Sequence, residues 1–282
     1  MNKVVIGTAQ FGLNYGINNK IGKISQKKVN EIIKFCIKNK IYIFDTSQNY
    51  GDSETKIGNF FIKKKFKKLK IITKISSNNY KSLDTSVKKL RQVPYAVLFH
   101  NFKDYLKKSF RRKIFKECSK LGIKKIGVSV YHDDDINKVI NSNNINIIQL
   151  PLNLIDRHFL ENKTLDKLKR KKIEIHIRSI FIQGLLFMNK KKIKKDFPDL
   201  EKNLEIIDLI ANQNKISINE LCFRWAYSIK KVDKIVIGID NLNQLKNNIK
   251  ILKKKNKKIK FSNKINILKY KRIKSLDPRT WK

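Results

Sequence analysis

Few residues in this sequence break up the chain or divide it into parts. Its 282 residues include 10 glycines and 4 prolines, and no stretch rich in glycine, proline or serine interrupts the pattern. Such a stretch would mark a linker, and no convincing internal repeat is present either. We therefore expect a single domain over residues 1–282, with enough hydrophobic residues, 41%, to bury one large core.

The sequence also lacks the groupings that cross-link a chain or bind a metal. Its three cysteines are odd in number, widely spaced in apolar or helical surroundings, and form no Cys-x-x-Cys motif: Cys36, Cys118 and Cys222. That spacing supports neither a disulfide framework nor a zinc site. We expect three small buried thiols and no bound metal.

Long apolar runs are missing as well. No window approaches the ~18 apolar residues of a membrane span. The first residues, MNKVVIGTAQFG, begin a strand-like run rather than a charged segment followed by a long apolar one. We expect no signal peptide and no membrane anchor, and hence a cytoplasmic protein.

Acidic residues are scarce: Asp and Glu number 23 against 65 Lys and Arg, a formal net charge of +42. Such a charge ordinarily indicates a nucleic-acid partner. The basic residues, however, are mostly lysines spread along the chain among many Asn and Ile residues, as AT-rich coding produces. We favour solvated lysine faces on a small-molecule enzyme, because exposed aromatics are not interleaved. A nucleic-acid or polyanion binder on the same scaffold is the alternative.

What the sequence does contain is a regular alternation of strands and helices. Amphipathic stretches such as SQKKVNEIIKFCIKN (25–39), capped by Ser25, separate short apolar runs. Continuous apolar strands between helices predict a parallel sheet, and eight of them predict a (β/α)8 TIM barrel rather than an open doubly wound sheet. The expected strands are Val4–Ile6, Ile41–Phe44, Ile71–Thr73, Tyr95–Phe99, Lys125–Val128, Ile147–Leu150, Ile173–Ile177 and Lys234–Ile237.

Two segments depart from the simple repeat. Residues 199–213 and 216–229, between the seventh and eighth expected strands, both have a helical pattern, so one of these helices is extra. The last residues, about 262–282, follow neither period, and we expect this tail to pack over one end of the barrel.

Polar side chains follow five consecutive expected strands at the point where each strand ends. Barrel enzymes carry their working groups at the carboxyl ends of the strands. We therefore expect these residues to share one face: Asp45, Lys74, His100, Ser129, and Gln149 with Asn153.

Proton transfer to an oxygen is the chemistry that four positions suggest. A free tyrosine has a pKa near ~10 and is a poor acid at neutral pH. Lys74 beside Tyr50 would lower that pKa, Asp45 would keep Lys74 charged, and His100 would hydrogen-bond the same substrate oxygen. Each residue alone is more often a cap, a turn former or a packing residue, and it is their convergence that favours a proton-donating site.

The stretch DTSQNYGDSE (45–54) resembles the aldo/keto reductase signature, in which an Asp-Thr-Ala-like strand end precedes Tyr-Gly-x-Ser-Glu. The similarity continues in the expected order along nearly the whole chain. The other similar segments are GTAQFGLNYG (7–16), IITKI (71–75), VLFHN (97–101), IGVSVY (126–131), IIQLPLNLIDR (147–157), IRSIFIQGLL (177–186) and VIGIDNLNQLKNNI (236–249).

The resemblance implies NAD(P)H-dependent reduction of a small carbonyl compound, with sugar derivatives among the candidates, and leaves the oligomeric state open. It makes Tyr50 the general acid, tuned by Lys74 and Asp45, with His100 positioning the carbonyl. A cofactor-binding protein without turnover is less consistent with the presence of all four residues.

The resemblance also implies a set of cofactor ligands. They are Ser129 and Gln149 for the carboxamide, the phosphate-loop residues Ser179, Gly184, Leu185 and Gly238, and Asn248 for adenine. Many relatives have an asparagine where this chain has Val130, so one carboxamide contact is either missing or supplied by Asn153. Arg178 stands where several relatives stack an aromatic on the nicotinamide; it would stack through its guanidinium plane or bind an anionic substrate.

The last loop departs from relatives that pair Lys or Arg with the 2′-phosphate of NADPH. This chain has Asp240 and Gln244 there. An acidic side chain beside a phosphate is unfavourable and suits a free ribose. We therefore hypothesise that NADH is accepted, and that it is either preferred over NADPH or used alongside NADPH where other lysines compensate.

Overall fold

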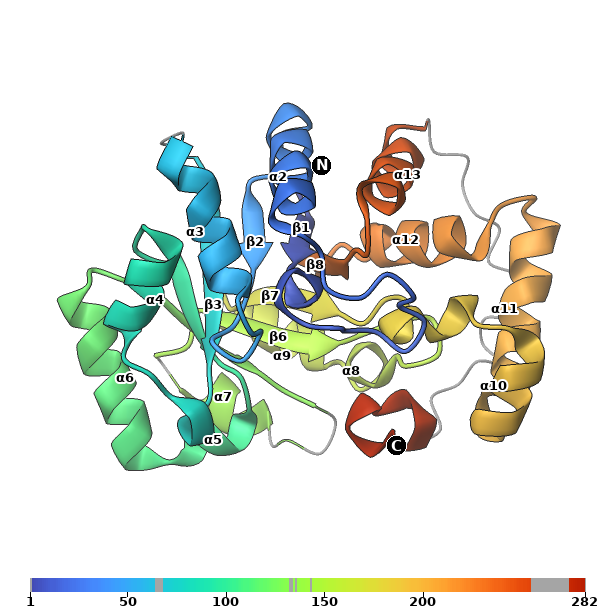
Figure 1. Cartoon of the computed structure of the whole chain (residues 1–282). Coiled ribbons are helices and arrows are strands. Elements are labelled where there is room, and N and C mark those ends of the chain that lie inside the picture. The colour runs from blue at the N-terminus through green and yellow to red at the C-terminus, as the bar shows by residue number, and fades with distance from the viewer. Residues whose placement is uncertain are drawn as a thin grey trace.

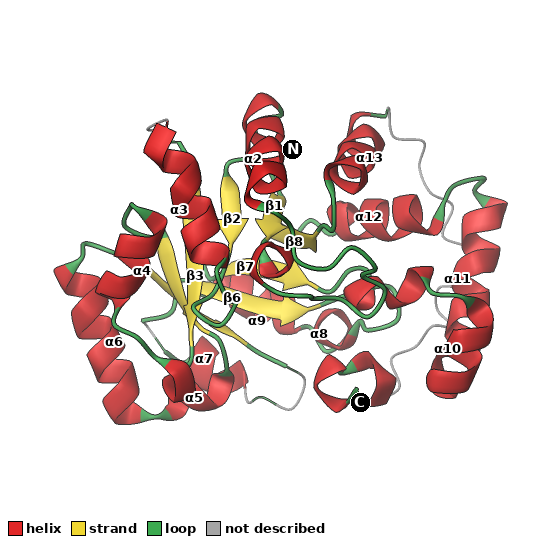
Figure 2. Cartoon of the chain, viewed as in Figure 1, coloured by secondary structure: helices red, strands yellow, loops and turns green. Residues whose placement is uncertain are grey.

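Eight parallel strands close into a barrel in chain order, surrounded by helices (Figures 1 and 2). The computed structural model describes residues 2–63, 68–131, 134, 136–142, 144–254 and 274–281. The predicted (β/α)8 TIM barrel is confirmed. Its strands are β1 (Val4–Gly7), β2 (Ile43–Asp45), β3 (Lys70–Ile75), β4 (Ala96–Phe99), β5 (Lys125–Ser129), β6 (Ile147–Pro151), β7 (Glu174–Arg178) and β8 (Lys234–Gly238).

Each predicted strand is present, but β2 begins later than expected. The amide of Ile41 donates to the carbonyl of Cys36, 2.9 Å away, and so closes the turn after the preceding helix instead of pairing in the sheet. The strand therefore begins at Ile43 and ends on Asp45, which pairs with Gly7 and Ile72 of the neighbouring strands. Asp45 is thus held by the barrel itself rather than by a loop.

Helices lie between the strands on the outside of the barrel (Figure 2). In the described part they are α1 (Ala9–Gly12), α2 (Gln26–Lys38), α3 (Ser53–Lys63), α4 (Leu83–Leu90), α5 (Phe102–Leu106), α6 (Lys108–Lys120), α7 (Ile136–Ile140), α8 (His158–Glu161), α9 (Thr164–Arg170), α10 (Lys190–Asp196), α11 (Glu201–Gln213), α12 (Ile218–Ser228) and α13 (Leu242–Lys253), with 3-10 helices at Ser77–Asn79, Ile182–Phe187, Pro198–Leu200, Lys274–Leu276 and Pro278–Thr280. None of the helices in these ranges is both long and apolar enough to cross a membrane.

Helix α2 follows from its sequence as expected. The Ser25 hydroxyl accepts a hydrogen bond from the Lys28 amide, which satisfies one of the free donors at the helix start. Apolar residues at helical spacing, among them Val29 and Cys36, are fully buried against the barrel. The segment between β7 and β8 contains both predicted helices, α11 and α12, and also α10. All three cysteines are buried free thiols, as predicted.

The inside of the barrel is apolar below the strand ends and polar at them. Side chains two residues apart on a strand share one face. Ile72 and Ile147 belong to a buried apolar cluster, and Lys74 and Gln149 stand two residues further along the same strands. The polar groups are therefore stacked on an apolar layer and converge at the carboxyl-terminal end of the barrel.

The described end of the chain, residues 274–281, returns to this part of the molecule (Figure 1). Leu276 is buried, and the Trp281 ring lies 5.4 Å from that of Phe197, centroid to centroid. Arg279 reaches the cavity at the carboxyl-terminal end of the barrel. The remainder of the expected tail, residues 262–273 and 282, lies outside the described residues.

Candidate active site

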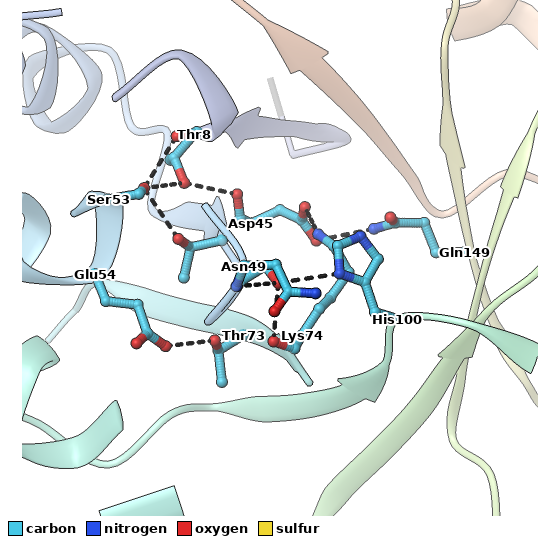
Figure 3. Close-up of polar contacts among 11 residues, drawn as sticks. Thr8, Asp45, Asn49, Ser53, Glu54, Thr73, Lys74, His100 and Gln149 are labelled. Carbon is cyan, nitrogen blue, oxygen red and sulfur yellow. Dashed lines mark hydrogen bonds and ion pairs between the residues drawn. The ribbon is translucent and has the colours of Figure 1, made fainter. Parts of the chain in front are cut away.

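A buried ion pair forms the base of the site. The Lys74 Nζ donates a hydrogen bond to Asp45 Oδ1, and both residues are 2% exposed. The second carboxylate oxygen, Oδ2, accepts from Gln149 Nε2 at 2.8 Å (Figure 3). Burying either charge alone would be costly, so each group stabilises the other in the charged form.

Hydroxyl groups hold the strand end that carries Asp45. Thr8 Oγ1 donates to the Asp45 carbonyl at 3.0 Å, and Ser53 Oγ lies 2.9 Å from both the carbonyl and the hydroxyl of Thr8 (Figure 3). Glu54, 1% exposed in the first turn of α3, accepts from Thr73 Oγ1 at 2.7 Å. These bonds join α3 to β1, β2 and β3, and so fix the loop between β2 and α3 that contains Tyr50.

His100 is oriented by a serine of the same loop. Its Nδ1 lies 3.1 Å from Ser47 Oγ, which also donates to the Lys74 carbonyl at 3.0 Å. Burial, together with the positive charge of Lys74, lowers the pKa of His100 to about 3. The imidazole is therefore neutral in the physiological range, and it lies edge-on to the Tyr50 ring with the centroids 5.6 Å apart.

Tyr50 lies beside the Lys74–Asp45 ion pair, and the net shift of its pKa is upward rather than downward as the sequence suggested. Burial and the Asp45 carboxylate raise its pKa, and Arg178 acts in the opposite direction. The Lys74 Nζ is 5.1 Å from the centre of the Tyr50 ring, over its face. Burial lowers the pKa of Lys74 itself, against the effect of Asp45. Desolvation of the phenol therefore dominates the pKa of Tyr50 in this arrangement, and the lowering of that pKa by Lys74 stays a prediction.

One cavity of about 520 Å³ connects these residues with α13. Most of the predicted residues line it: Asp45, Tyr50, Lys74, His100, Ser129, Gln149, Arg178, Ser179, Gly184, Gly238, Asp240, Gln244 and Asn248. Leu185 is instead fully buried in the core. Asn153 is used locally, since its Oδ1 accepts from the amides of Ile155 and Asp156 at 3.0 and 2.8 Å.

The far end of the cavity is rich in amides and contains one carboxylate. The Asp240 Oδ2 accepts from Gln244 Nε2 at 2.9 Å, and the Asp240 amide donates to Gln244 Oε1 at 2.8 Å. Gln10 Nε2 reaches the other carboxylate oxygen at 3.4 Å, while its own Oε1 is buried without a partner. This end therefore presents a fixed acidic group to a ligand, beside a buried acceptor on Gln10 without a partner in the described part of the chain.

Comparison with known proteins decides what kind of barrel this is. A model of the aldo/keto reductase family matches residues 3–269. The chain belongs to the aldo/keto reductase family. Two solved structures from Pseudomonas aeruginosa, both named as inferred aldo-keto reductases, resemble it with a TM-score of 0.64 at 15% identity over 88% of each chain. At that identity the likeness supports the fold alone. The sequence matches no curated protein.

Membership of the aldo/keto reductase family implies an oxidoreductase, and the cavity contains further residues that sequence reasoning missed. They are Gln10, Tyr15, Tyr131, Asn219, Asn247 and Arg279. Gln10 and Tyr15 lie within the segment GTAQFGLNYG, and Tyr131 follows Ser129 by two residues, so the family motifs surround them. Arg279 lies outside those motifs, in the tail that we expected to pack over one end of the barrel, and it reaches the cavity from there.

Proposed function

We propose that this protein reduces an aldehyde or ketone to an alcohol, using NADH or NADPH. The observation that carries the proposal is the convergence of Tyr50, His100 and the Lys74–Asp45 pair at one end of the cavity. An acid, a neutral hydrogen-bonding ring and a buried cation are what protonation of a carbonyl oxygen requires. Each comes from a different strand end or the loop that follows it, which is where barrels carry their chemistry.

Tyr50 acts as the proton donor. The phenol carries its proton at neutral pH and is available to a carbonyl oxygen, and since burial raises its pKa the transfer depends on stabilisation of the phenolate that forms. The neutral His100 ring lies beside it and orients that oxygen. Lys74, held by Asp45, provides positive charge next to the phenolate that forms as the proton leaves, which favours the transfer.

The cavity residues fit a nicotinamide dinucleotide, which when bound supplies the hydride. The Gln149 amide has its nitrogen committed to Asp45, so its oxygen is the group left to accept from a carboxamide, beside the Ser129 hydroxyl. A Cβ at Gly238 would come within 2.9 Å of the Gln10 side-chain amide, so a side chain at this position would displace Gln10. The start of α13 offers amide donors to phosphate oxygens.

We further propose that NADH is preferred over NADPH. Asp240 is held in place by Gln244 and Gln10 at the α13 end of the cavity. A carboxylate accepts hydrogen bonds from a ribose hydroxyl and repels a phosphate at the same place. The residues present thus favour the free ribose.

Following NADH and NADPH oxidation with a panel of aldehydes, ketones and sugar derivatives tests the proposal. The Tyr50→Phe variant, which keeps the ring and removes only the hydroxyl, is the matched control. We expect turnover with at least one carbonyl class and a large loss of kcat in the variant. Full activity in Tyr50→Phe would refute the assigned acid, and no turnover with any carbonyl would refute the activity.

A further inference from the structure

Arg178 is a cation held against the wall of the cavity at the end of β7. Its guanidinium carbon lies 4.2 Å from the centre of the Tyr131 ring, and its Nη2 donates to the Val130 carbonyl at 3.0 Å. Stacking on Tyr131 and this hydrogen bond from one edge hold the guanidinium plane in place. Among the described residues, its other hydrogen bond is a long one, 3.5 Å, from Nη1 to Ser179 Oγ, so donors of this five-donor group are left for a ligand.

The charge of Arg178 is not balanced in the way that the neighbouring charges are. Lys74 is paired with Asp45, and Arg279, which lies 3.8 Å from the centre of the same Tyr131 ring, is paired with Asp277 through Nε and Oδ1 at 2.8 Å. Within the described ranges, no carboxylate lies at ion-pair distance from Arg178. A half-buried cation without a counter-ion is a site that favours an anion.

Arg178 also lies in the same cavity as Tyr50, the proposed proton donor. Arg178, Tyr50 and Tyr15 line the same cavity, and the charge of Arg178 opposes the effect of burial on the pKa of both tyrosines. Tyr15, from the loop after β1, lines the same cavity and adds a phenolic hydroxyl. A guanidinium and a phenol beside the proton donor form a set of N–H and O–H donors suited to an oxyanion.

We propose that the substrate is an anionic carbonyl compound whose carboxylate or phosphate is bound by Arg178 beside the Tyr15 hydroxyl. The inference rests on the proposed reduction and names its substrate class. A neutral substrate of the same shape would leave the guanidinium desolvated and unpaired, and sites built for a polar group discriminate strongly against ligands that lack it.

The test compares matched substrates that differ in the anion alone. We would measure kcat/KM for 4-oxobutanoate against butanal, and for glyceraldehyde 3-phosphate against glyceraldehyde. The proteins are wild type, Arg178→Met, Arg178→Lys and Lys230→Met, and Lys230 is an exposed residue before β8 at the opposite end of the barrel. Titration with succinate or glycerol 3-phosphate, against butane-1,4-diol or glycerol, measures binding without turnover.

We expect wild type to have a higher kcat/KM for the anionic member of at least one substrate pair than for its neutral member. Arg178→Met should reduce this anionic-to-neutral ratio by about 10- to 100-fold, which is the effect of removing a charge-assisted hydrogen bond. Arg178→Lys should retain part of the ratio, and Lys230→Met should retain all of it. Because the formal charge of +42 also steers anions, the ratio is measured again in high salt, which removes steering but not contact.

Turnover of the neutral members without an anion preference would overturn the inference and leave carbonyl reduction intact. A ratio that is unchanged in Arg178→Met, or a loss of cofactor affinity alone, would also overturn it, since Arg178 would then serve the cofactor. If no carbonyl is reduced, the proposed reduction fails, and the titrations still decide whether Arg178 binds anions.

Discussion

The Lys74 ammonium lies over the face of the Tyr50 ring, 5.1 Å from its centre, while its hydrogen bond goes to Asp45. The lysine therefore acts on the tyrosine through space and not as a hydrogen-bond donor to a phenolate in this state. The burial that brings them together raises the pKa of Tyr50, so the site holds a protonated acid rather than a preformed base.

The pH dependence of reduction should follow from the pKa values of Tyr50 and His100. Because the pKa of Tyr50 is raised, it keeps its proton to higher pH, and reduction falls only in strongly alkaline solution. His100, whose pKa is about 3, should add no inflection between pH 5 and 8. Oxidation of the alcohol, which needs the phenolate, should increase with pH as reduction falls in strongly alkaline solution. A sigmoidal loss of reduction near neutral pH would contradict this assignment.

Breaking the ion pair should show strong coupling between its members. Asp45→Asn leaves the buried Lys74 charge with no carboxylate, and we expect a loss of about 3–5 kcal/mol in the free energy of unfolding. Lys74→Met should have a comparable effect, and the double variant should cost much less than the sum. Urea unfolding of the three variants and wild type gives the coupling energy. Additive losses would mean that the two charges are separately solvated.

Gly12 should be necessary for the position of Tyr50. A Cβ at residue 12 would lie 1.8 Å from the Tyr50 carbonyl oxygen and 2.7 Å from the Ser53 amide, so any side chain displaces this loop. We expect Gly12→Ala to cost about 2 kcal/mol in unfolding free energy, as overpacking does, and to reduce kcat. Gly122→Ala is the comparison: nothing lies within 4 Å of its added Cβ, but its φ of +70° strains any side chain, so it measures backbone strain without a clash and should leave kcat unchanged. An equal loss of kcat in the two variants would be evidence against the contact.

Removing the carboxylate of Asp240 should change cofactor preference. Wild type should bind NADH more tightly than NADPH at moderate salt. Asp240→Asn retains the shape of the side chain and removes the repulsion, which near a surface is worth about 1–4 kcal/mol at 4 Å. We expect Kd for NADPH to fall about tenfold and Kd for NADH to change much less. Fluorescence titration with both cofactors measures this, and tighter NADPH binding by wild type would disprove the preference.

Glu174, at the opposite end of the barrel, should make the unfolding free energy depend on pH in the acidic range. Burial alone would raise the pKa of Glu174, but hydrogen bonds from His176 and Lys125, at 2.9 and 2.6 Å, outweigh it and lower that pKa to about 2. A carboxylate with a lowered pKa stabilises the fold above its unfolded value, ~4.3, and loses this contribution as pH falls toward the folded one.

Glu174→Gln should therefore flatten the pH dependence of the unfolding free energy between about pH 4.5 and 2. Denaturant unfolding of both proteins across that window measures the difference. The same slope in wild type and variant would show that Glu174 titrates normally in the folded chain.

Sequence alone was sufficient for the barrel and for grouping most of the predicted residues that line the cavity. Apolar runs of strand length between amphipathic helices allow few other architectures, and the carboxyl ends of parallel strands meet at one face whatever the details of packing. Asp45, Lys74 and His100 could therefore be grouped without coordinates. Likewise, Ser25 could be assigned as a cap, because capping depends on residues a few positions apart.

Only the tertiary structure decided how those residues act. The direction of the Tyr50 pKa depends on burial and on distances to Asp45 and Arg178, which are set by packing between segments far apart in the chain. The position of Arg279 was likewise decided by packing between distant segments, because this residue reaches the cavity from the end of the chain. Local periodicity carries information about neighbours on one element, whereas desolvation and Coulomb interactions depend on every atom around a group, whatever its place in the sequence.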